Sequence, residues 1–150
     1  MKISIGVPPG PQATELAVRA ESLGYDRLWM YDSAALYEDI WIHLARAAEA
    51  TDRIGLGTAV LVPNLRHVMT TASAIATVDR LAPGRLACAI GTGYTARLVL
   101  GKRALSWQTT RTWVEQLRGL LRGDVVEIDG RPCQMIHRPE LAKARPIEVP

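Results

Sequence analysis

Apolar and polar residues alternate along this chain with two different periods. Runs in which every second residue is apolar predict strands, and runs with apolar residues three and four apart predict helices. We expect strands at 2–7, 26–31, 54–62 and 86–90, and helices at 12–23, 39–51, 67–81 and 109–122. Strand and helix therefore alternate, which is the pattern of an α/β fold with a parallel sheet.

The segment after the last of these helices has a different pattern. Residues 125–129 and 132–136 flank Asp129-Gly130, a dipeptide favoured in two-residue hairpin turns, so we expect a small hairpin there. A further extended segment is expected at 145–150. No low-complexity linker interrupts the chain, so residues 1–150 are predicted to form a single domain.

The length of the chain limits the architecture. It has 150 residues, whereas a closed (β/α)8 barrel typically needs about 250. We therefore expect about half of a TIM barrel: strands one to four, a hairpin insertion and the start of strand five. A complete, open, flavodoxin-like sheet is the alternative. A half barrel has two open strand edges, which favour pairing with another copy and hence a homo-oligomer.

Composition narrows the class of protein. Hydrophobic residues make up 48% and charged residues 22% of the chain, and no apolar run approaches the roughly 20 residues that span a bilayer. The start, MKISIGVPPGP, has the pattern of a strand and not of a signal peptide. We expect a cytoplasmic protein without a membrane partner. The net charge of +3 is scattered, which argues against nucleic-acid binding. The two cysteines do not suggest a disulfide framework.

Asp32 is the first candidate for a functional residue, because it directly follows the second predicted strand. A carboxylate at the carboxyl end of a parallel strand can bind a ligand or take part in proton transfer. Aspartate is also favoured in turns and at helix N-caps, and that local role is the stronger expectation from the sequence alone.

Two glycine-containing segments are further candidates. Gly57 lies inside the third predicted strand, where glycine indicates a bulge, close approach of a ligand, or simply room for a neighbouring helix. Residues 91–96 match G-x-G-x-x-[GA] after the fourth strand, but no strand ending in an acidic residue follows about 20 residues later, so a dinucleotide fingerprint is rejected. Small residues there could still offer backbone N–H groups to an anion, with Arg97, Lys102 and Arg103 adding charge.

The sequence contains no recognisable metal site or nucleophile. Its three histidines have no metal-ligand spacing, and Cys133 with His137 is not a ligand set. A nucleophile elbow and a phosphate-loop lysine motif are both missing. If the protein is an enzyme, an organic cofactor would carry out the chemistry on a small-molecule substrate, with no metal.

Four segments, taken in order, resemble the luciferase-like monooxygenase superfamily. They are AESLGYDRLWMYDS (20–33), LARAAEATDRIGLGTAVLVPNLRH (44–67), ATVDRLAPGRLACAIGTG (76–93) and VEQLRGLLRGDVVEIDGR (114–131). The resemblance implies a TIM barrel of roughly twice this length, of which the chain is the N-terminal half. IGTGYTAR followed by LGKRALSW is more similar to the branch that uses the deazaflavin coenzyme F420, as in methylenetetrahydromethanopterin reductase.

The resemblance also implies roles for individual residues. The branch often has a non-prolyl cis peptide in strand three as a backrest for the deazaflavin, and the matching positions are Ala59-Val60. Asp32 would face the cofactor ring and would be the catalytic residue. The other implied cofactor-binding residues are Thr58, Ala59 and Val60 behind the ring, and Asn64, Gly91, Thr92, Gly93 and Tyr94 along its polar arm. Many members have histidine where this chain has Ser33.

The implied activity is hydride transfer between reduced coenzyme F420 and an organic substrate. An FMN-dependent monooxygenase of the same superfamily is the alternative, with FMN as cofactor. A third hypothesis belongs to another class: a non-catalytic half barrel that associates with itself.

Overall fold

The computed structural model describes residues 1–135, so the segment expected at 145–150 and the end of the expected hairpin lie outside it. The strands are β1 (Ser4–Val7), β2 (Arg27–Met30), β3 (Gly55–Leu61), β4 (Leu86–Ile90), β5 (Val126–Ile128) and β6 (Arg131–Cys133). The helices are α1 (Ala13–Ser22), α2 (Ile40–Ala50), α3 (Val68–Leu81), α4 (Thr95–Leu98) and α5 (Trp107–Leu121).

The first four strands form one parallel sheet in the order β1-β2-β3-β4. Each strand pairs with the next one along the chain, and a helix lies between them, as in successive βα units of a TIM barrel. A flavodoxin-like sheet has the order 2-1-3-4-5, so that alternative is wrong. β5 and β6 form the expected antiparallel hairpin, with Asp129 (φ 51°) and Gly130 (φ 71°) in its turn.

Side-chain caps fix where the helices begin. The Asp39 carboxylate accepts from Trp41 N–H (2.8 Å) and starts α2. The Ser106 hydroxyl accepts from Thr109 N–H (3.0 Å), which starts α5 at Trp107, two residues before the expected position. These caps use backbone N–H groups that have no partner within a helix.

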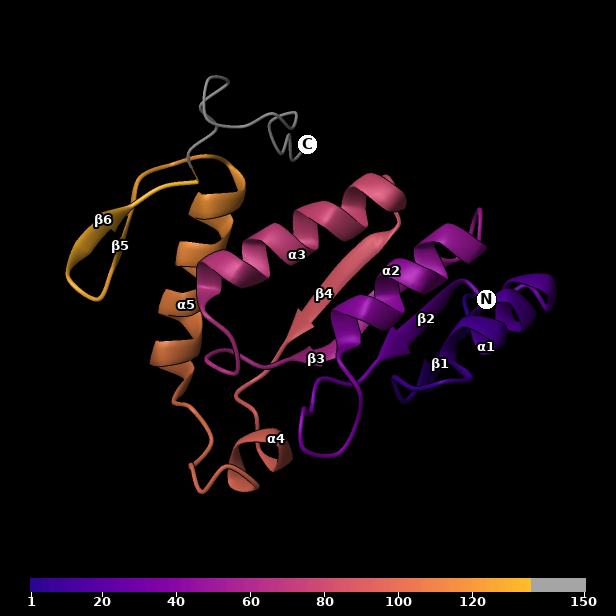
Figure 1. Ribbon diagram of the computed structural model, residues 1–150, viewed down its shortest axis with the longest axis horizontal. Helices are drawn as coiled ribbons and strands as arrows, with labels where there is room; N and C mark the ends of the chain where they lie inside the picture. The colour runs from indigo at the N-terminus through magenta and orange to yellow at the C-terminus, as the bar shows by residue number, and fades with distance from the viewer. Residues whose placement is uncertain (136–150) are drawn as a thin grey trace.

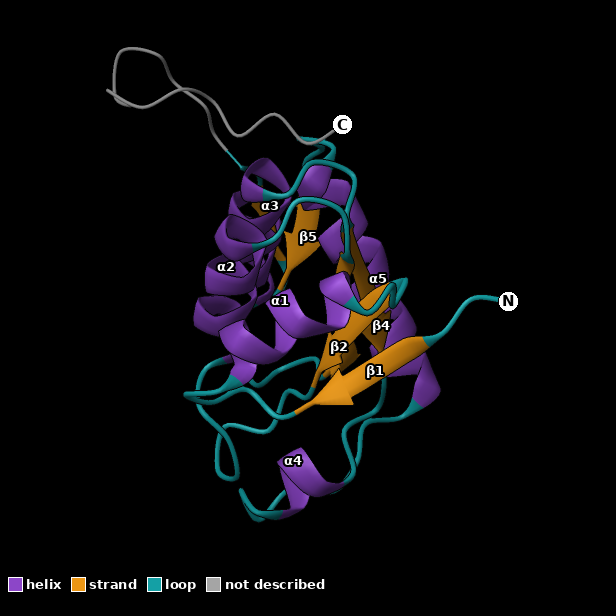
Figure 2. Ribbon diagram, turned by 90° about the vertical axis from the view of Figure 1, so that its right-hand side faces the viewer, coloured by secondary structure: helices purple, strands orange, loops and turns teal. Residues whose placement is uncertain are grey.

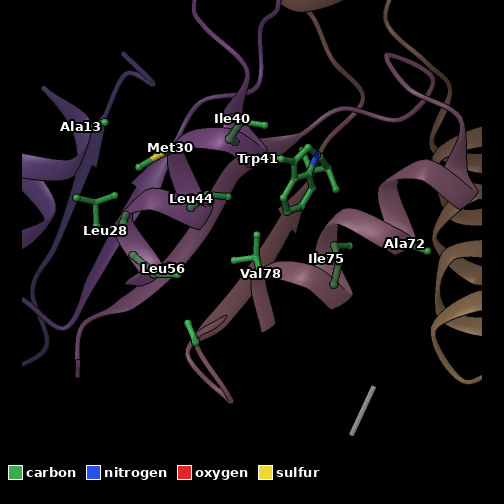
Figure 3. Packing of buried hydrophobic residues seen from close by; sticks show 14 of the residues in the cluster. Ala13, Leu28, Met30, Ile40, Trp41, Leu44, Leu56, Ala72, Ile75 and Val78 are labelled. Carbon is green, nitrogen blue, oxygen red and sulfur yellow. The ribbon is translucent and has the colours of Figure 1, made fainter. Parts of the chain in front are cut away.

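The hydrophobic core lies between the sheet and α1, α2 and α3, which pack side by side along one of its faces (Figures 1 and 2). Leu28 and Met30 of β2 and Leu56 of β3 are fully buried there, against Leu44 of α2 and Val78 of α3 (Figure 3). Period-two strands and period-3.6 helices thus turn their apolar residues towards the same layer, as the sequence predicts. Within residues 1–135, no helix is long and apolar enough to cross a membrane.

On the opposite face of the sheet, small residues of β3 and β4 lie beside large side chains of β2. The register places Trp29 of β2 beside Gly57 of β3, and Gly57 beside Ala87 of β4. A Cβ atom at Gly57 would lie 2.5 Å from the Trp29 ring and 2.6 Å from the Ala87 carbonyl oxygen. Gly57 therefore makes room for a side chain of the neighbouring strand and not for a helix.

The carboxyl ends of the four parallel strands point to the same end of the molecule, where α4 lies (Figure 1). α4 has only four residues, too few to give a helical period in the sequence, and it was not predicted. This end is where ligands bind in parallel α/β folds.

Candidate cofactor cleft at the strand ends

A cleft of about 580 Å³ lies at the carboxyl ends of β2, β3 and β4, within the range of small-molecule sites. The loop after β2 contributes Tyr31, Asp32, Ser33, Leu36 and Tyr37, the end of β3 contributes Ala59, Val60 and Val62, and the segment after β4 contributes residues 91–96. Trp107, the first residue of α5, completes the lining. Segments far apart in the sequence therefore meet in one concave site.

β3 is irregular where it borders this cleft. The Ala59-Val60 peptide bond is cis, as the resemblance implied, and the pairing with β4 shifts register between Ala59 and Leu61. Val60 lines the cleft with 39% of its surface exposed. Thr58 does not line it: this residue is fully buried, and its hydroxyl donates to the Ala89 carbonyl of β4 (3.1 Å).

The segment after β4 needs glycine at two positions. A Cβ atom at Gly91 would lie 2.8 Å from the Val60 Cγ2 atom, and one at Gly93 would overlap Val62 Cγ1. Gly93 also has a φ of +76°, a backbone conformation that residues other than glycine rarely adopt. Gly91 N–H donates to the Leu61 carbonyl (3.1 Å), so it is not free for an anion. The close approach of β4 to β3 therefore shapes the cleft.

The other residues implied for the polar arm differ in their placement. Thr92 and Tyr94 line the cleft, and Tyr94 is largely exposed. Asn64 has a φ of +63° in the loop after β3, is exposed, and does not line the cleft. Arg97, Lys102 and Arg103 do not line it either; Arg97 Nε–H instead donates to the Arg103 carbonyl (2.7 Å) and closes its own loop.

Asp32 lies in the cleft wall, but it does not cap a helix. One of its oxygens accepts from Arg66 Nη1 (2.8 Å) and the other from Val62 N–H (3.2 Å). The expectation of a local turn or N-cap is therefore wrong, because the α2 cap is Asp39 and the partners of Asp32 come from the end of β3 and the loop that follows.

Arg66 is the residue that sequence reasoning missed. Its second nitrogen, Nη2, donates to Asp39 Oδ2 (2.9 Å), so it joins two carboxylates. Burial alone would lower the pKa of Arg66, but the hydrogen bonds and charges of Asp32 and Asp39 outweigh burial and raise it. Burial alone would raise the pKa of Asp39, but Arg66, together with the backbone N–H groups of Trp41 and Ile42, outweighs burial and lowers that pKa. The sequence does place Asp32 and Asp39 after β2 and Arg66 after β3, and the loops after parallel strands lie at the same edge of a sheet.

Ser33 stands where many family members have histidine. It lines the cleft, is 8% exposed, and its hydroxyl oxygen has no hydrogen-bond partner among the described residues. His43 and His67 lie elsewhere: His43 is buried in α2 against Glu38 (2.6 Å), and His67 caps α3. Among the residues that line the cleft there is therefore no imidazole.

Cys88 of β4 and Cys133 of β6 are both free cysteines. Burial raises the pKa of the Cys88 thiol to about 11, against a smaller opposing effect of the Thr58 hydroxyl, so this thiol stays protonated near neutral pH. Residues 1–135 contain no group of three or more histidine, cysteine or acidic side chains placed to hold a metal ion.

A second cleft, of about 650 Å³, lies at the amino ends of β3 and β4. One of its charged side chains is hydrogen-bonded within the protein: Arg85 donates to the Thr51 hydroxyl (2.9 Å) and to the carbonyls of Ala48 (2.8 Å) and Ile54 (3.3 Å). In TIM barrels this end contributes to stability and the opposite end holds the active site. The cleft at the carboxyl ends of the strands is therefore the candidate ligand site.

A parallel βα arc with a ligand-sized cleft at its strand ends defines a TIM-barrel type of binding site. The family model for the luciferase-like monooxygenases matches residues 4–150, and the chain belongs to this family of oxidoreductases and monooxygenases. The parallel sheet and the membership of the family confirm the α/β, TIM-barrel expectation.

Individual relatives also match this chain. The chain is 32% identical over 130 residues to 5,10-methylenetetrahydromethanopterin reductase of Methanolobus tindarius, a match that covers 83% of this chain and 39% of the relative. It is 40% identical over 93 residues to F420-dependent glucose-6-phosphate dehydrogenase of Kineococcus radiotolerans, covering 57% of this chain and 27% of the relative. The chain thus spans less than half the length of these relatives.

Solved structures share the arrangement of elements. The coenzyme F420-dependent tetrahydromethanopterin reductase of Methanopyrus kandleri superposes with a TM-score of 0.73 at 25% identity, over 88% of this chain and 44% of that one. The oxygenating component of 3,6-diketocamphane monooxygenase from Pseudomonas putida, in complex with FMN, gives a TM-score of 0.78 at 17% identity, over 99% and 48%. At 17% identity, the likeness to the diketocamphane monooxygenase shows the fold alone.

Proposed function

We propose that this chain provides the ring-binding part of the cofactor site of an F420-dependent oxidoreductase, which transfers hydride between reduced coenzyme F420 and a small organic molecule. The observation that carries the proposal is the irregular end of β3, where Val60 lines the cleft with 39% of its surface exposed and lies against Gly91 of the segment after β4. Two names support coenzyme F420 over FMN: the F420-dependent glucose-6-phosphate dehydrogenase that is 40% identical over 93 residues, and the coenzyme F420-dependent reductase whose structure is 25% identical.

The residues present fit a flat ring system. Val60 and Gly91 both line the cleft, and a Cβ atom at position 91 would be too close to the Val60 side chain. With glycine there, no side chain projects from position 91 into the cleft. Tyr31, Leu36, Tyr37 and Trp107 add apolar and aromatic surface around it, as is usual for cofactor clefts. Thr92 and the polypeptide backbone around Gly93 would contact the polar arm.

The role of the protein in this proposal is binding and orientation. When bound, coenzyme F420 supplies or accepts the hydride. Ala59, Val60 and Gly91 would support one face of the ring, and Tyr94 and Trp107 would shield it from water. Asp32 would place a carboxylate in the cleft wall, with both of its oxygens already hydrogen-bonded to Arg66 and Val62.

An anaerobic titration with coenzyme F420 and, separately, with FMN tests this proposal. We expect saturable quenching of the F420 fluorescence by the wild-type chain and weaker binding of FMN. Gly91→Val should weaken F420 binding about tenfold or more, because the new side chain meets Val60 in the cleft. Gly10→Val is the matched control, since nothing lies within 4 Å of a Cβ atom there. Tight FMN binding without F420 binding would favour the monooxygenase alternative.

A second proposal follows from the edges of the sheet. Within residues 1–135, β1 and β4 each pair with only one strand and leave a row of backbone groups without a partner strand. Such edges associate readily, so we propose that the 150-residue chain forms a homo-oligomer through them. Sedimentation velocity should give a mass above that of one chain, and a concentration-independent monomer would contradict this proposal.

A further inference from the structure

Arg66 connects three separate segments of the chain beside the cleft, and of Arg66, Asp32 and Asp39 only Asp32 lines it. It lies in the loop between β3 and α3, and its two terminal nitrogens contact Asp32 (2.8 Å) at the end of β2 and Asp39 (2.9 Å) at the start of α2. Asp39 simultaneously caps α2 through its other oxygen, which accepts from Trp41 N–H (2.8 Å). One guanidinium group therefore joins the segment after β2, the loop after β3 and the N-terminus of α2.

The inner part of this connection reaches the cleft itself. The Asp32 side chain is 1% exposed and the Arg66 side chain 18% exposed, so the pair is shielded from water. The second oxygen of Asp32 accepts from Val62 N–H. Val62 comes two residues after Val60, and both residues line the cleft. Asp32 is thus hydrogen-bonded directly to the segment that follows the irregular end of β3.

A guanidinium group suits this position better than an ammonium group. Two carboxylates lie on different sides of Arg66, and a planar guanidinium can donate to both at once, whereas a lysine ammonium is a single point of charge. Against the effect of burial, Arg66 and the backbone N–H groups of Trp41 and Ile42 lower the pKa of Asp39, which agrees with the contact between Arg66 and Asp39. The formal charges of Asp32, Asp39 and Arg66 sum to one negative charge, because two carboxylates face one guanidinium group.

We infer that Arg66 is a positioning residue of the cofactor cleft: it holds Asp32, and through Asp32 the β3 exit, in the geometry that receives the ring. This inference rests on the proposed function for the identity of the ligand. Its structural content, that Arg66 sets the geometry around Val60, Val62 and Gly91, can be tested without any ligand.

The test combines stability and ligand binding in a set of variants. Arg66→Met leaves the buried carboxylate of Asp32 without its cation, so we expect a lower unfolding midpoint and at least about tenfold weaker F420 binding. Arg66→Met combined with Asp32→Asn removes that buried charge. We expect the double variant to regain most of the stability but not the affinity. Arg66→Lys should retain stability and only part of the affinity.

Arg111→Met is the matched control. Arg111 also pairs with a carboxylate, that of Glu115 (2.9 Å), but both side chains are exposed on α5. We expect no change in stability or affinity for this variant. A purely structural role for Arg66 predicts that affinity returns together with stability in the double variant, and that result would overturn the inference. An Arg66→Met variant that binds F420 as the wild type does would also overturn it.

Amide chemical shifts separate this inference from the proposed function. In Arg66→Met without ligand, the amide signals of Val60, Val62 and Gly91 should move, and those of the β5–β6 hairpin should not. If the wild-type chain binds no F420, the proposed function fails, and these shifts alone decide the inference. Unchanged signals around Val62 would then contradict it.

Discussion

Gly57→Ala is expected to lower the free energy of unfolding by about 3 kcal/mol. The added Cβ atom would lie 2.6 Å from the Ala87 carbonyl oxygen of β4 and 2.5 Å from the Trp29 ring of β2. Neither neighbour can move easily: the carbonyl belongs to the paired β4 strand, and Arg27 lies over the Trp29 ring at 5.2 Å. Chemical denaturation monitored by circular dichroism measures the loss.

Gly10→Ala serves as the control for that measurement. It makes the same chemical change at a loop position where nothing lies within 4 Å of the new atom, so its stability should stay within about 0.5 kcal/mol of the wild type. If Gly57→Ala were equally neutral, the close packing of β2, β3 and β4 described above would be incorrect.

Gly93→Ala is expected to have the largest effect on the cleft. Two costs add at this position: a φ of +76°, which disfavours a side chain by about 1–2 kcal/mol, and overlap of the new atom with Val62 Cγ1. Because Val62 and Gly93 both line the cleft, relief of the overlap must change its shape. We expect F420 affinity to fall about tenfold or more, as measured by fluorescence titration, and stability to fall as well.

Gly101→Ala separates these two costs. Gly101 has a similar φ of +69°, but nothing lies within 4 Å of its Cβ position. This variant should lose only the backbone contribution to stability and should bind F420 as the wild type does. Equal losses of affinity in the two variants would show that the overlap with Val62 does not matter.

The sequence predicts the order and type of the long elements because their apolar periods are regular. β4 was predicted with its observed limits, and α2 and α3 within one residue at each end. The resemblance to the luciferase-like family also implied the cis peptide at Ala59-Val60, which the structure contains. These features depend on a local pattern or on a family motif, and both can be recognised in a single sequence.

The features that the sequence did not predict depend on distant partners. Asp32 looks like a turn residue until Arg66, 34 positions later, is known to contact it. Gly57 looks like a site for a helix until the register places Trp29 beside it. α4 is too short to show a period. Contacts of this kind follow from the pairing of strands and loops in space, which no local pattern contains.

We propose that the strand ends around Val60 and Gly91 receive the ring of coenzyme F420. Amide chemical-shift mapping during a titration with F420 tests this most directly, because a second cleft lies at the amino ends of the strands. We expect saturable shifts at Ala59, Val60 and residues 91–94. Shifts confined to the cleft around Ala48 and Arg85, or no saturable shifts at all, would contradict it.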